Sequence, residues 1–138
     1  MTLEEHLSKE YILSEEYYEI FKEEFRYWSE KFGLIGWEFH FYFGTDENEY
    51  SARGRLVNDH ESRIALVFLN KTFEGTEPNE ESVRQVAYHE ACELLLSKLK
   101  FLMEQRNVSD REIEEETHNV IRVMENCFFY DDLKRRNP

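Results

Sequence analysis

The segment Trp37-Glu38-Phe39-His40-Phe41-Tyr42-Phe43 decides the fold class of this chain. Its residues alternate, so that Trp37, Phe39, Phe41 and Phe43 fall on one side and the residues between them on the other. Successive side chains of a β-strand point to opposite sides of the sheet, so this alternation is the pattern of a strand with one buried face. We therefore predict a half-buried strand over 37–43, which argues against an all-helical bundle.

Further strands are predicted at 50–58 and 63–69, with Gly54 in the first of them as a candidate β-bulge. The segments 44–49 and 58–62 are rich in turn-forming residues. Short turns between consecutive strands favour an antiparallel meander.

Helices are predicted at 14–32, 79–103 and about 110–130. In each, apolar residues recur at steps of three and four, and a capping residue stands at the start. These caps are Ser14, Asn79 and Ser109. The expected fold is thus α+β: a helix, a three-stranded antiparallel sheet and two helices in one domain over 1–138, with 1–12 and 131–138 as less ordered tails.

The composition describes an acidic globular domain. The chain has 138 residues, of which 41% are hydrophobic, and a formal net charge of −13. Such a charge repels phosphate groups, and a nucleic-acid-binding protein needs a basic surface, so we expect no nucleic-acid partner. We also expect no membrane partner and a cytoplasmic location, because the chain shows no apolar span or secretory signal. Cys92 and Cys127 are then expected to stay reduced.

The segment Val86-Ala87-Tyr88-His89-Glu90-Ala91-Cys92-Glu93-Leu94-Leu95-Leu96 carries the chemistry that the sequence suggests. It has the spacing of the H-E-x-x-H motif, in which two histidines bind zinc and the glutamate is the general base, but Glu93 replaces the second histidine. His89 and Glu93 are one helical turn apart, so both side chains can reach a common ion. Glu90 lies about a quarter turn away, where it can contact a metal-bound water.

A catalytic zinc site needs a third protein ligand and leaves one position open. His118, on the helix at 110–130, is the best candidate, because a short connection between the helices allows an antiparallel return. Glu114 and Glu115 precede it by about one turn. We expect them, with Tyr88, to support the ligands from a second shell.

These features resemble the small zincin-type metallopeptidase domains that are often found among phage-encoded proteins. The resemblance covers about residues 14–130, and only His89 and Glu90 match the motif strictly. It implies a zinc ion held by His89, Glu93 and His118, with Glu90 activating a water that hydrolyses a peptide or protein substrate. The carboxylate of Glu93 adds negative charge, which favours harder ions, so Mn²⁺ or Fe²⁺ are alternatives.

Other interpretations stay open. The chain can be a catalytically degenerate zincin-like protein, an acidic binding or inhibitor protein that mimics DNA and binds a basic partner. Glu115-x-x-His118 also has the spacing of a carboxylate-bridged di-metal site, although such sites need the motif twice. Finally, His89 can be a hydrogen-bonded core histidine, with Glu90 and Glu93 as ordinary helix surface.

Overall fold

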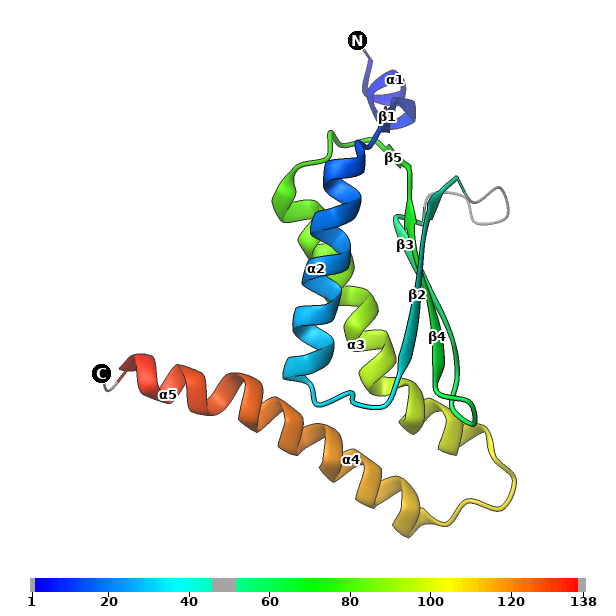
Figure 1. Ribbon diagram of the computed structural model, residues 1–138, viewed down its shortest axis with the longest axis vertical. Helices are drawn as coiled ribbons and strands as arrows, with labels where there is room; N and C mark the ends of the chain where they lie inside the picture. Colours follow the sequence, from blue (N-terminus) through cyan, green and yellow to red (C-terminus); the bar gives the residue numbers. More distant parts are fainter. Residues whose placement is uncertain (1, 46–51, 137–138) are drawn as a thin grey trace.

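The structure is a computed structural model that describes residues 2–45 and 52–136 (Figure 1). Its elements, in chain order, are α1 (Leu3–Ser8), β1 (Glu10–Ile12), α2 (Glu15–Lys31), β2 (Glu38–Gly44), β3 (Gly54–Asp59), β4 (Ile64–Asn70), β5 (Thr72–Glu74), α3 (Glu80–Glu104), α4 (Asp110–Met124), a π-helix (Glu125–Phe129) and α5 (Tyr130–Arg136). The α+β class is therefore confirmed.

The main sheet has the strand order β2-β4-β3. β4 pairs with β3 in antiparallel orientation and with β2 in parallel orientation. The predicted antiparallel meander is therefore wrong. Alternation reveals which side of a strand is buried but not which strand lies beside it, and the apolar strand β4 takes the centre, where both of its edges are paired.

The register between β3 and β4 runs without interruption from Gly54 opposite Leu69 to Asp59 opposite Ile64. Gly54 therefore forms no β-bulge. The start of the strand predicted at 50–58 and most of the turn predicted at 44–49 lie outside the described residues.

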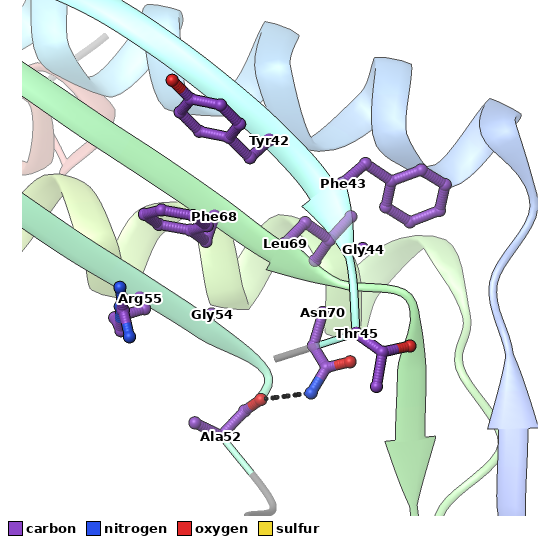
Figure 2. A pocket seen from close by; sticks show the side chains of 10 residues that line it. All are labelled: Tyr42, Phe43, Gly44, Thr45, Ala52, Gly54, Arg55, Phe68, Leu69 and Asn70. Carbon is purple, nitrogen blue, oxygen red and sulfur yellow. Dashed lines mark hydrogen bonds between the residues drawn. The ribbon is translucent and has the colours of Figure 1, made fainter. Parts of the chain in front are cut away.

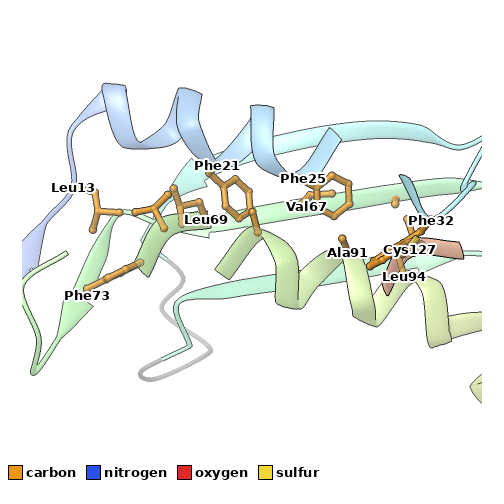
Figure 3. Packing of buried hydrophobic residues seen from close by; sticks show 13 residues of the cluster. Leu13, Phe21, Phe25, Phe32, Val67, Leu69, Phe73, Ala91, Leu94 and Cys127 are labelled. Carbon is orange, nitrogen blue, oxygen red and sulfur yellow. The ribbon is translucent and has the colours of Figure 1, made fainter. Parts of the chain in front are cut away.

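α2 and α3 cover one face of this sheet, and the core lies between them and the strands (Figures 1 and 3). Phe21 and Phe25 of α2 are fully buried. The ring of Phe25 meets those of Phe39 and Phe41 nearly at right angles, with centroids 5.1 and 5.6 Å apart. Edge-to-face pairs of this kind add about 0.5–1.5 kcal/mol beyond the burial of apolar area. The aromatic side of 37–43 therefore faces the core, as its alternation predicts.

α3 is fixed both at its start and along α2. Asn79 and Ser82 form a reciprocal capping box, with Ser82 N–H donating to Asn79 Oδ1 at 2.8 Å and Asn79 N–H donating to Ser82 Oγ at 2.9 Å. Arg84 of α3 forms ion pairs with Glu24 of α2 and with Glu80. The pair between Arg84 and Glu24 joins the two helices and holds them in one register against the sheet.

Regular structure also occurs near both ends. β1 pairs with β5 in a small antiparallel sheet. The predicted helix at 110–130 continues as α4, the π-helix and α5, and its Val123 and Cys127 pack against the core. Among the described residues, no helix combines the length and apolar character that a membrane crossing requires.

Candidate functional site

His89 and Glu93 lie on an exposed side of α3. Their side chains are 69% and 45% exposed, and His89 Nε2 lies 3.5 Å from Glu93 Oε1. The pair is separated by one helical turn, as its spacing requires. Both groups are thus accessible to a ligand from solvent.

Glu90 lies on the adjacent, inward side of the same turn and is only 6% exposed. Its carboxylate lies directly over the backbone of Gly54, where a Cβ would come within 3.1 Å of Glu90 Oε1. Only a residue without a side chain lets β3 approach α3 this closely. The glycine at position 54 therefore has a structural role: it allows β3 to approach α3 closely and does not form a β-bulge.

Two hollows follow one another along the boundary between β3 and α3. The first has a volume of about 400 Å³, and its lining consists of Ala52, Arg53, Gly54, Gln85, Val86, His89 and Glu90. The second has a volume of about 230 Å³, and its lining consists of Leu56, Asn58, His60, Glu93, Ser97, Lys100, Phe101 and Glu104. We call this boundary the β3–α3 groove. It brings His89, Glu90 and Glu93 to one surface.

β3 is an edge strand, so one side of its backbone has no strand beside it among the described residues. Asn70 N–H donates to Arg53 O at 2.8 Å, so Arg53 and Asn70 form a hydrogen-bonded pair. Such pairs recur at every second residue of an antiparallel ladder, so the backbone groups of Arg55 and Val57 also point toward β4. The backbone groups of Gly54, Leu56 and Asn58 then point outward along the groove. An extended peptide can pair with such an edge.

The other residues predicted for the site lie elsewhere. His118, Glu114 and Glu115 are exposed on α4, whose buried residues are Glu116 and Val120, and none of them lines either hollow of the groove. Over residues 2–45 and 52–136, no group of three His, Cys, Asp or Glu side chains is placed to hold a metal ion. The structure thus brings together His89, Glu90 and Glu93, but not His118.

Tyr88 lies on the α2 side of α3, with its ring centroid 4.7 Å from that of Trp28. Burial raises the pKa of the Tyr88 hydroxyl, and a hydrogen bond with the Cys92 thiol raises it further. Burial likewise raises the pKa of Cys92. Both groups therefore stay protonated at neutral pH and belong to the packing between the helices.

His60 lines the groove, whereas the composition of the segment 58–62 predicts only a turn. Its ring lies between those of Trp37 and Phe101, with centroids 5.4 and 5.3 Å away. Its Nε2 atom is buried and has no hydrogen-bond partner among the described residues. The turn-like composition of 58–62 gave no indication of this position.

A third hollow, of about 360 Å³, opens at the end of the sheet and shares Ala52 and Gly54 with the first hollow of the groove (Figure 2). There the Tyr42 and Phe68 rings stack with centroids 4.9 Å apart, and the Arg55 guanidinium lies 4.7 Å from the centre of the Phe68 ring. Asn70 Nδ2 donates to Ala52 O at 2.9 Å across its rim. Thr45 and Ala52 of this hollow flank the segment 46–51, which lies outside the described residues.

Comparison of the chain with protein-family models, with curated proteins and with solved structures gives no match. We therefore infer the function from the geometry of the groove.

Proposed function

We propose that this protein binds an extended segment of a partner protein along the outer edge of β3, in the β3–α3 groove. The observation that carries the proposal is the edge position of β3 beside hollows of about 400 and 230 Å³. The strand edge supplies backbone hydrogen bonds, and hollows beside it accept alternate side chains of the bound segment.

The net charge of −13 indicates the chemistry of the partner. The field of an acidic protein attracts basic segments, raises their association rate and repels acidic ones. Glu93 and Glu104 also line the groove and can receive Lys or Arg side chains. The proposed partner is therefore a basic segment in extended conformation.

A second function, metal-dependent peptide hydrolysis, is favoured by the pairing of His89 and Glu93 at 3.5 Å beside Glu90. In this proposal the pair would supply two ligands for zinc, manganese or iron, the ion would polarise the substrate carbonyl, and Glu90 would serve as the general base. A third ligand is needed, and His118 is not beside the pair. A bound protein substrate or partner then has to complete the site.

Binding is tested by titrating ¹⁵N-labelled protein with a peptide of alternating Lys and Val, using alternating Glu and Val as the control. Backbone amide exchange is then recorded by NMR. We expect the amides of Leu56 and Asn58 to gain protection with the basic peptide alone. The amides of Arg55 and Val57, which point toward β4, are the matched controls and should change little. Absence of binding, or protection confined to other elements, would contradict the proposal.

The metal proposal is tested by elemental analysis after incubation with zinc. His89→Ala and Glu93→Ala should lose the ion, while His118→Ala should retain it, because His118 lines neither hollow of the groove. Glu90→Gln should then retain the metal and lose peptide hydrolysis. A wild-type protein that takes up no metal would rule out hydrolysis by this route and leave the peptide-binding proposal untouched.

A further inference from the structure

The continuous helical stretch 110–136, formed by α4, the π-helix and α5, carries an exposed apolar row. The row consists of Ile121, Met124, Phe128 and Phe129. Met124 and Phe129 are 51% and 50% exposed. Single apolar residues on a surface are ordinary, but a row on one helix marks an interaction surface.

Most of the row lies outside the side by which this helix contacts the body, but Phe128 also contacts α2, with its ring centroid 6.2 Å from that of Trp28. Val123 and Cys127 pack on the core, and the Cys127 thiol lies 3.2 Å from Lys31 O. Lys31 also forms an ion pair with Asp131 at 3.0 Å. A π-helix holds more residues per turn than an α-helix, so Cys127 and Phe128 contact the body while Phe129 emerges beside them. In Figure 1 the helix continues past the end of α2, away from the sheet.

Charge is distributed unevenly along this helix. The segment 110–116 contains Asp110 and Glu112 and a run of three glutamates, while the other end carries Lys134, Arg135 and Arg136. These three are the only run of consecutive basic residues in a chain whose net charge is −13. A second copy of the same helix, laid antiparallel, would place each basic end on an acidic start.

The spacing of the residues agrees with this pairing. With a two-fold axis between Met124 and Glu125, Ile121 of one copy lies opposite Phe128 of the other, and Glu114 lies opposite Arg135. Positions 114 and 121 are separated by one heptad, as are 128 and 135, so each pair lies close to one side of the helix; the π-helix at Glu125–Phe129 rotates the second pair relative to the first. A parallel pair would instead place the basic ends side by side.

We propose that the exposed row and the charged ends of the 110–136 helix form an antiparallel homodimer interface. The helix is roughly 40 Å long at 1.5 Å per residue, and the row occupies its middle turns. Such a surface lies at the small end of stable interfaces, so we expect a reversible dimer with a dissociation constant on the order of micromolar. The inference does not depend on the β3–α3 groove.

The first test is sedimentation velocity of the full chain between about 1 and 200 µM, a range that brackets micromolar association. We expect a monomer–dimer equilibrium of the 16.8 kDa chain. Ile121→Glu should weaken it at least tenfold, because it places a charge in the apolar row. Ile35→Glu, the same change at another exposed isoleucine, is the matched control and should leave the equilibrium unchanged.

The second test addresses orientation. Arg135→Glu should weaken the dimer, and adding Glu114→Arg in the same chain should restore it. The control adds Glu23→Arg to Arg135→Glu, which gives the same net charge but places the new arginine outside the interface. This variant should not regain the dimer. Circular dichroism confirms that each variant is folded. A chain that stays monomeric at every concentration, including one that instead binds anionic vesicles, would overturn the proposal. A dimer whose dissociation constant is unchanged by Ile121→Glu would also overturn it. So would a failure of Glu114→Arg to restore the dimer that Arg135→Glu weakens.

Discussion

Replacement of Gly54 by alanine tests the close approach of β3 to α3 that brings Glu90 into the groove. A Cβ at this position would lie 2.7 Å from Val86 Cγ1 and 3.3 Å from Phe68 O. Carbon atoms in good contact are about 3.5–4.0 Å apart, so strand and helix must separate or Val86 must leave its rotamer. Valine in a helix has one strongly preferred χ1 rotamer, which makes that rotation costly.

The expected loss of stability follows from two opposing terms. Overpacking typically costs about 1–3 kcal/mol, and replacement of glycine by alanine recovers roughly 0.4–1 kcal/mol through the unfolded chain. We therefore expect Gly54→Ala to lower the unfolding free energy by about 1–2 kcal/mol. For a chain of this length, each kcal/mol lowers the melting temperature by about 3–5 °C.

Urea denaturation of Gly54→Ala, Val86→Ala and the double variant measures this directly. Val86→Ala removes the atom that the new methyl group meets, so the double variant should be more stable than the sum of the single effects by at least about 1 kcal/mol. Gly44→Ala is the matched control, because its Cβ would meet no atom of the described residues within 4 Å. Additive effects, or equal losses from Gly44→Ala and Gly54→Ala, would refute the reasoning.

Three further predictions concern the core, a helix cap and the thiols. Phe25→Ala should lower the unfolding free energy by about 3–5 kcal/mol in denaturant titrations, because the buried ring contacts two strand aromatics; a loss below that of an exposed residue would contradict the packing. Asn79→Ala should cost about 1 kcal/mol, measured by thermal unfolding, because the N-terminus of α3 loses its capping bond; Asn79→Asp should retain most of the stability. Burial raises the pKa of Cys92 and Cys127, so at about pH 8 the native thiols hold less thiolate than the unfolded chain. Iodoacetamide should therefore modify them slowly in native protein and rapidly in urea, as followed by mass spectrometry; equal rates would show that the thiols are exposed.

Local features of the sequence predicted the elements well. The alternation at 37–43 and the capping residues Asn79 and Ser109 identified a strand and two helix starts, because those signals depend on neighbours along the chain. The order of the strands depends instead on which edges of β4 are covered. The parallel pairing of β2 with β4 follows from that arrangement. The alternation of side chains along β2 is the same for a parallel and an antiparallel partner, so it does not indicate the orientation.

In the candidate site, too, some placements follow from local sequence and others depend on contacts between distant segments. His89, Glu90 and Glu93 share one helical turn, so their mutual placement follows from the sequence. The position of His118 depends on how α4 crosses α3. That crossing is set by contacts such as the 3.5 Å ion pair between Lys98 and Glu116, and it leaves His118 exposed. His60 enters the groove because Trp37 and Phe101 enclose its ring, and this contact joins residues from distant segments.

The central position of β4 has a consequence for the order of folding. β2 leaves the ribosome before β4, its partner in the main sheet, exists, whereas β3 and β4 are joined by a short turn and can pair as a hairpin at once. Pairing across the sheet must wait for the non-local closure of β2 onto β4, which is intrinsically slow. Until then the backbone edge of β2 that pairs with β4 is open, and open strand edges promote aggregation at high concentration. We expect the yield of refolded protein to fall as its concentration rises, and stabilising the β3–β4 hairpin should hasten closure of the sheet.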